Sequence, residues 1–171
     1  MYDVGMYGGS FNPLHLGHVN DIIMASNQCK KLYVVLSVTK DKTEVDHRER
    51  LMWLKDVTKH MSNVTVIEIF DNSTSKEAYD WDVGASDVKT AIGDVINVVF
   101  AGDDYKGKGI WERLYPEAEI VYFSRDIINI SSTQIRNNLY KYYEYLPKIV
   151  QKYYVKKVCI VGTESCGEKY S

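Results

Sequence analysis

Five short apolar runs, most of them rich in β-branched residues, alternate along this chain with segments of helical pattern. Runs of that length and composition are typical of strands buried on both faces of a sheet. Strands that alternate with helices run parallel, because each crossover returns the chain to the same end of the sheet. The sequence therefore predicts one α/β domain with a doubly wound parallel sheet of about five strands. The expected strands are residues 3–6, 31–38, 64–70, 97–101 and 119–123.

The segments between the strands differ in character. A polar loop over residues 71–82 carries Tyr79 and Trp81. It is long for a connector, and long loops in compact domains are usually functional or disordered. Four further stretches carry helix signals, such as capping residues and apolar residues at helical spacing. Helices are expected after Pro13, after Asp46, over about residues 86–95, and from Ser131 or Ser132 through Leu139.

Composition restricts the classes of function. The chain has 171 residues, which suits one compact domain with a real core. Its 21 Lys and Arg against 23 Asp and Glu give a net charge of −2, so no overall charge attracts nucleic acid or anionic lipid. No apolar run approaches the roughly 18 residues of a membrane span, and the first residues enter a strand, leaving no room for a signal peptide. The three cysteines lack Cys-x-x-Cys spacing, which favours reduced thiols and predicts a cytoplasmic protein.

The segment from Tyr7 to His18, with the sequence YGGSFNPLHLGH, has the pattern of a strand, a glycine turn and a helix start. Gly8 and Gly9 would let the main chain take positive φ and approach a ligand closely. His15 and His18 are three residues apart, so a helix that starts near the first of them places both imidazoles on one side of its first turn. Unpaired main-chain N–H groups and the positive end of the helix dipole lie there too. This combination suits a phosphate group.

A second motif, ISSTQIR, runs from Ile130 to Arg136 after the last predicted strand. Ser131 or Ser132 can cap a helix start there, and a Ser-Ser-Thr sequence alone predicts no more than a cap. Arg136 lies one turn into that helix, so its guanidinium could lean back over an anion that faces the helix amides. The motif therefore predicts a second contribution to a phosphate site.

These two motifs resemble the paired signatures of the HxGH nucleotidyltransferases, which have a Rossmann-like fold. The resemblance implies that His15 and His18 bind the triphosphate of a nucleotide and steady the transferring phosphorus, with Arg136 as a third catalytic residue. It also implies an ATP site formed by both motifs and by the end of the fourth strand. The residues expected in that site are Gly8, Gly9, Ser10, Phe11, Gly102, Asp103, Ser131, Ser132 and Thr133.

The chemistry expected of such a site is direct displacement. No serine or cysteine has an evident base beside it in the sequence, and the histidines suit charge neutralisation better than covalent catalysis. An acceptor phosphate would therefore attack the α-phosphorus of ATP in line, and pyrophosphate would leave. Mg²⁺ would screen the phosphate oxygens, although no dedicated protein metal site is evident.

Three other segments resemble the family of bifunctional nicotinamide-nucleotide adenylyltransferases and ribosylnicotinamide kinases. They are residues His47–Leu54, Tyr79–Asp82 and Asn138–Pro147. The resemblance implies that ATP and nicotinamide mononucleotide react to give NAD and pyrophosphate. It places Asn12, Lys42, Arg48 and Trp81 at the mononucleotide.

The tail from Val155 to Gly167 resembles that family's entry into its kinase domain, a strand followed by a phosphate-binding loop. A P-loop needs Lys and then Ser or Thr after the last glycine, whereas this chain has Glu168 and Lys169. We therefore expect a nucleotidyltransferase domain over residues 1–154, a remnant of a P-loop kinase domain over 155–171, and no kinase activity.

Two alternatives remain beside the mononucleotide activity. One is a phosphopantetheine adenylyltransferase on the same scaffold, against which the Trp81 loop and the tail argue. The other is a sensor that binds NAD or ATP without turnover, which the presence of His15, His18 and Arg136 disfavours. The tyrosines of residues 140–154 have few lysines beside them, so packing is favoured over base stacking and no nucleic-acid or membrane partner is expected. The sequence neither predicts nor excludes a homo-oligomer.

Overall fold

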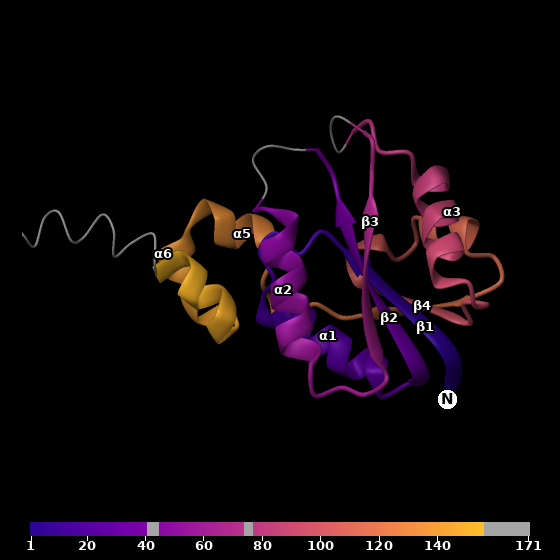
Figure 1. Ribbon diagram of the computed structural model, residues 1–171, viewed down its shortest axis with the longest axis horizontal. Coiled ribbons are helices and arrows are strands. Elements are labelled where there is room, and N and C mark those ends of the chain that lie inside the picture. Colours follow the sequence, from indigo (N-terminus) through magenta and orange to yellow (C-terminus); the bar gives the residue numbers. More distant parts are fainter. Residues whose placement is uncertain (41–44, 74–76, 156–171) are drawn as a thin grey trace, which may run out of the picture.

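The computed structural model describes residues 1–40, 45–73 and 77–155, and a five-stranded sheet in the order β3-β2-β1-β4-β5 forms its centre (Figure 1). Every neighbouring pair of strands is parallel. The chain reverses its direction of travel across the sheet between β1 and β4, which confirms the predicted doubly wound, Rossmann-like arrangement. The strands are β1 (Tyr2–Gly9), β2 (Cys29–Val38), β3 (Val64–Phe70), β4 (Val98–Gly102) and β5 (Glu119–Phe123).

Helices cover both faces of this sheet. In Figure 1, α1 and α2 lie on one side and α3 lies on the other, where α4 packs against it. The helical segments after β5 continue on the side of α1 and α2. The helices are α1 (Leu16–Ser26), α2 (His47–Thr58), α3 (Trp81–Ile92), α4 (Ile110–Leu114), α5 (Ser132–Asn137) and α6 (Leu139–Tyr142), with 3₁₀ turns at Asp103–Tyr105 and Tyr143–Tyr145. Residues 148–155 are also helical.

The start of α3 differs from the prediction of a helix over about 86–95. The Asp80 carboxylate accepts hydrogen bonds from the main-chain N–H groups of Asp82 and Val83, at 3.0 and 3.1 Å. This cap starts the helix at Trp81, and the left-handed Gly93, with φ of 70°, ends it. Trp81 is therefore the first residue of a helix, not part of a loop.

The helix predicted to run through Leu139 is also shorter. α5 ends at Asn137, because Asn138 leaves the helical conformation with φ of −151° and ψ of 80°. The Asn138 side chain then accepts a hydrogen bond from Lys141 N at 3.2 Å and so caps α6. An asparagine that caps a new helix thus divides the predicted one in two.

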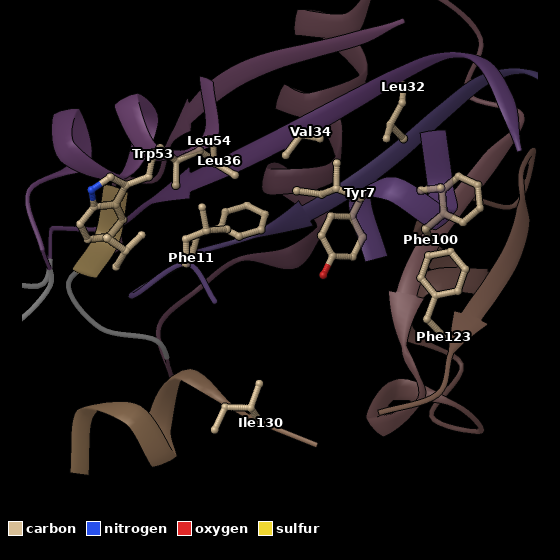
Figure 2. Packing of buried hydrophobic residues seen from close by; sticks show 14 of the residues in the cluster. Tyr7, Phe11, Leu32, Val34, Leu36, Trp53, Leu54, Phe100, Phe123 and Ile130 are labelled. Carbon is tan, nitrogen blue, oxygen red and sulfur yellow. The ribbon is translucent and has the colours of Figure 1, made fainter. Parts of the chain in front are cut away.

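Side chains of the central strands alternate between two cores. Along β2, Leu32, Val34 and Leu36 face the side of α1 and α2, whereas Tyr33 and Val35 face α3. All five are buried, as expected for a strand covered on both faces. Figure 2 shows the first core, in which the side chains of β2 lie near Tyr7, Phe11, Trp53, Leu54, Phe100, Phe123 and Ile130.

The last helical residues pack on that same core. Val150 is buried, and the ring of Tyr153 meets Trp53 edge-on with centroids 5.4 Å apart. The predicted domain boundary after Tyr154 falls inside the 148–155 helix. Beyond Val155, the predicted kinase remnant lies outside the described residues. Among the residues described, every helix is too short or too polar to cross a membrane.

Candidate active site

A cavity of about 550 Å³ opens at the carboxyl ends of β1 and β4, where the order of strands reverses. Ligands of open α/β sheets bind at such a point. Gly8 and Gly9 line the cavity from β1, and Gly102 lines it from β4. Both sequence motifs contribute as well, through Ser10, Phe11, His15, Gly17 and His18 from the first and Ser131, Ser132, Thr133 and Arg136 from the second.

The first turn of the cavity wall takes its shape from Phe11. The prediction of positive φ at Gly8 and Gly9 is wrong, since both end β1 and the left-handed residue is Phe11, with φ of 48°. That conformation is unfavourable for a residue with a Cβ, so surrounding packing must hold it. The Phe11 ring is buried and meets His18 edge-on at a centroid distance of 4.9 Å. Its packing therefore supports the His18 ring.

His15 and His18 cap α1 reciprocally. Nδ1 of each ring accepts a hydrogen bond from the main-chain N–H of the other residue, at 3.2 and 3.4 Å, and the rings stack with centroids 3.6 Å apart. Because both Nδ1 atoms accept, the proton of each neutral ring sits on Nε2. Two parallel Nε2–H groups can then donate to one anion at the start of the helix.

Burial keeps both imidazoles neutral. Desolvation lowers the pKa of His15 from 6.5 to about 4, and the nearby Arg125 charge adds to the effect. Desolvation also holds the pKa of His18 well below its usual value, reinforced by His15 and Arg125. The pair therefore presents neutral donors at neutral pH.

This burial predicts a loss of stability in acid. Between pH 6.5 and 4 the unfolded chain binds a proton at His15 that the folded chain does not, so the free energy of unfolding falls as the pH falls through this range. A folded pKa of about 4 corresponds to a loss of about 3 kcal/mol in the free energy of unfolding once the pH is below that value. Above pH 6.5 His15 causes no such loss. Urea denaturation across this range should show His15→Gln with a flatter profile than the wild type. A wild-type slope in His15→Gln would contradict the expectation.

Arg136 and Ser132 tie the second motif to the first. Nη1 of Arg136 donates to Asn12 O at 2.5 Å, and Nη2 donates to Thr133 Oγ1 at 3.1 Å. The Ser132 hydroxyl donates to Pro13 O at 3.0 Å. These bonds turn two carbonyls of the first motif toward α5, so the two motifs form one wall of the cavity with the Arg136 guanidinium at its edge.

Arg125, in the loop after β5, is a cavity residue that the sequence analysis missed. Its Nη2 atom lies 3.0 Å from Asp104 Oδ1, and its main-chain N–H donates to Asp103 Oδ2 at 3.3 Å. It lines the same cavity as both histidines, and its charge contributes to their lowered pKa. Its position just after the end of a strand could have identified it from the sequence, because binding and catalytic residues are frequent in loops.

Asp21 is a second missed residue, one turn beyond His18 on α1. The Tyr7 hydroxyl donates to Asp21 Oδ2 at 3.0 Å, and both residues line the cavity. Desolvation raises the pKa of Asp21 and of Tyr7. The spacing of three residues from His18, which puts both on one helix face, was the signal that could have found it.

Aromatic rings form the other end of the cavity. Trp81 lies edge-on to Tyr79, Tyr105 and Trp111, with centroids 5.1, 6.3 and 5.8 Å away, and Trp111 lies 6.1 Å from Tyr115. All five line the cavity, together with the apolar Ala85, Val88 and Leu114. The cavity thus has a polar end at the motifs and an aromatic end at α3 and α4.

A model of the cytidylyltransferase-like family matches residues 6–138, a range that includes both motifs. The chain belongs to the cytidylyltransferase-like family. This membership confirms the resemblance to nucleotidyltransferases that the motifs predicted.

Proteins of two kinds are among the curated relatives of this cytidylyltransferase-like chain. The trifunctional NAD biosynthesis/regulator protein NadR of Salmonella typhimurium is 27% identical over 97% of this chain and 44% of its own length. NadR of Escherichia coli is 27% identical over 96% of this chain and 44% of its own length. A phosphopantetheine adenylyltransferase of Mycoplasma mycoides is 30% identical over 77% of this chain and 92% of its own length. This chain therefore spans less than half of each NadR protein.

Solved structures of NadR share the fold. NadR in complex with NR superposes with a TM-score of 0.67 at 19% identity, covering 86% of this chain and 44% of that one. NadR in complex with NAD and AMP-PNP gives a TM-score of 0.63 at 19% identity, covering 87% and 46%. These values confirm the fold of a single α/β domain.

The residues predicted to bind nicotinamide mononucleotide do not all meet at the cavity. Trp81 lines it, whereas Asn12 is buried behind it, and Arg48 is exposed and pairs with Asp46 at 3.0 Å. Arg48 lies outside the wall because its guanidinium turns back to the helix cap. Lys42 lies outside the described residues.

The predicted ATP residues lie at the cavity with one exception. Asp103 is absent from the wall, because its carboxylate turns to the Arg125 main chain, and its neighbour Asp104 lines the cavity instead. Within the described ranges, no group of three or more His, Cys, Asp or Glu could hold a metal ion.

Proposed function

We propose that this chain is an adenylyltransferase that joins ATP to nicotinamide mononucleotide, forming NAD and releasing pyrophosphate. One observation carries the proposal: a single cavity joins an anion-binding end, built from two motifs of the cytidylyltransferase-like family, to an aromatic end. In a dinucleotide product a flat base is joined through its ribose to a pyrophosphate, so one nucleotide half fits an aromatic end beside an anion-binding end.

The reaction is a direct transfer. The acceptor phosphate oxygen attacks the α-phosphorus of ATP, the bond to the β-phosphate oxygen breaks, and pyrophosphate leaves. The Nε2–H groups of His15 and His18, the Ser131–Thr133 helix start and Arg136 stabilise charge on the phosphates. Mg²⁺ would enter as the ATP complex and neutralise phosphate oxygens. Positioning and electrostatics supply most of the rate.

The aromatic end favours nicotinamide as the acceptor base. An N-substituted nicotinamide ring is flat and positively charged, and both properties favour contact with Trp and Tyr rings. Two buried polar atoms of the cavity residues, Thr39 Oγ1 and Trp111 Nε1, have no hydrogen-bond partner within the described part of the chain. A carboxamide could supply partners to such groups, since it both donates and accepts. The flexible, neutral arm of phosphopantetheine would make less favourable contacts with the aromatic rings than a flat cation does.

A second candidate is a phosphopantetheine adenylyltransferase. It is favoured by the relative of that name, of which this chain covers 92%. Release of pyrophosphate from ATP, measured with each acceptor offered separately, distinguishes the two. We expect turnover with nicotinamide mononucleotide. Turnover with phosphopantetheine alone would establish the second candidate, and ATP binding without turnover on either would indicate a sensor.

Trp81→Ala should raise the KM for nicotinamide mononucleotide about tenfold and leave the KM for ATP nearly unchanged. The reason is the lost stacking and area at the aromatic end, of about 1.4 kcal/mol. Steady-state kinetics test this, with Trp81→Phe as the variant that keeps a ring and most of the affinity. A collapse of the Tm, with both KM values moving together, would show instead that Trp81 only anchors the start of α3.

A further inference from the structure

Arg50, in the first turns of α2, is a buried arginine that the proposed chemistry does not use. The residue is 1% exposed. Its Nη1 donates to Ser10 O at 2.7 Å, and its Nε donates to Val45 O at 2.8 Å. One planar group therefore holds two carbonyls that are far apart in sequence.

Those carbonyls belong to the two loops that leave β1 and β2. Ser10 lies in the first motif, directly before Phe11 and the histidine pair, and it lines the cavity. Val45 lies at the other end of the segment that follows β2, directly before the Asp46 cap of α2. Asn12 adds a third bond between the loops, since its Oδ1 accepts from Val45 N at 3.1 Å.

The first motif is thus held from both sides. Arg50, on α2, donates to Ser10 O, and Arg136, on α5, donates to Asn12 O. A carbonyl held from behind fixes the direction of its peptide group, because the peptide unit is planar. The orientation of the turn that carries the histidines is therefore coupled to α2 through Arg50.

We infer that Arg50 is a positioning residue that fixes the first motif against the loop after β2, so that ATP and its acceptor meet in line. The inference rests on the proposed function, in which the first motif binds the triphosphate. Transfer between two bound substrates depends on their relative placement, and a misplacement of about 1 Å can cost 10² in rate. Each substrate can still bind by itself when the first motif is held less firmly. The loss of Arg50 is therefore expected to lower kcat.

Arginine suits this role better than lysine. A guanidinium presents Nε and Nη1 in a fixed fork, which matches two carbonyls at once, whereas an ammonium is a single flexible donor centre. The Arg50→Lys variant would keep the charge but could not hold both carbonyls in the same geometry. This conservative variant should therefore restore only part of the function.

The test compares Arg50→Met and Arg50→Lys with Thr58→Val. Thr58 lies on the same helix, is 5% exposed and donates its hydroxyl to Leu54 O at 2.7 Å, away from both loops. We expect Arg50→Met to lower kcat per folded enzyme about ten- to thirtyfold and Arg50→Lys about three- to fivefold, with both KM values within about threefold of wild type. Thr58→Val should lower the Tm and leave kcat unchanged.

Folding and binding are measured on the same samples. The Tm of each variant sets an assay temperature at which it is folded, and calorimetric titration with ATP gives its Kd. Arg50→Lys, which retains the buried cation, keeps the comparison valid if Arg50→Met fails to fold. Unchanged kcat in the Arg50 variants, or a rise of both KM values at constant kcat, would overturn the inference.

The two proposals fail in different ways. Wild-type turnover with phosphopantetheine alone overturns the proposed acceptor, and the same Arg50 comparison is then made with that substrate. If neither acceptor supports turnover, both proposals are overturned.

Discussion

His18→Ala should lower kcat for adenylyl transfer by about 10²–10³, the effect of losing one preorganised donor to a developing charge. The His18 ring is fixed by its stack on His15, by Phe11 and by the reciprocal cap, so little reorganisation is needed when phosphate arrives. Arg136→Ala should cause a loss of similar size, because it removes a cation at the cavity edge and the bond to Asn12 O. Turnover is measured with both substrates saturating.

Stability must be separated from chemistry in both variants. His18→Ala removes half of the α1 cap, and lost caps cost about 1 kcal/mol. Ser26→Ala is a matched control, since Ser26 Oγ donates to Ile23 O at the far end of the same helix. It should lower the Tm slightly at wild-type kcat. Rates within about threefold of wild type in folded His18→Ala and Arg136→Ala would contradict the assignment.

The sequence predicted the sheet well because its strands are short apolar runs, most of them rich in β-branched residues. Residues 64–70 and 119–123 are strands with the predicted bounds, and β2 starts only two residues before its predicted place. Such continuous apolar runs have few alternatives in a compact domain. The parallel, doubly wound arrangement followed from the alternation of strands with helices and from the right-handed crossover rule.

Helix boundaries were less predictable because single side chains decide them. Asp80 starts α3 inside the predicted loop, and Asn138 ends the helix of the second motif inside the predicted helix. A cap depends on whether one carboxylate or amide oxygen reaches the free main-chain N–H groups, two for Asp80 and one for Asn138. Sequence alone does not show which rotamer it takes.

The site residues that belong to sequence motifs could be predicted. The residues that the fold brings together from separate elements could not. His15, His18 and Arg136 were found from spacing, and the structure places all three at one cavity. Arg125 and Asp104 come from two different strand ends, so no local pattern joins them. The aromatic end likewise draws on α3, α4 and the turn after β4. Arg48 was chosen for its charge, and the structure turns it toward its own helix cap.

Gly17→Ala should lower kcat about 10²-fold while leaving the Tm almost unchanged. A Cβ built at Gly17 would lie 2.9 Å from both Cε1 and Nδ1 of His15, and 3.4 Å from Ile130 Cγ2. At contacts below 3 Å something must shift. The His15 side chain is short and cannot relieve the contact by a small adjustment, so its ring must leave the stack with His18. Misplacing one donor of the pair by about 1 Å is enough for a loss of this size.

The small expected change in stability makes this variant informative. Alanine is favoured over glycine in a helix by about 1 kcal/mol, which offsets the strain that its methyl group creates in the first turn of α1. A rate loss therefore cannot be attributed to unfolding if the Tm holds. Nuclear magnetic resonance of the two imidazoles gives an independent readout, because a His15 ring displaced from the stack toward solvent should titrate closer to its usual pKa of 6.5. Wild-type kcat with unmoved histidine signals would show that the stacked pair tolerates a side chain at position 17, and that its spacing is not what positions the triphosphate.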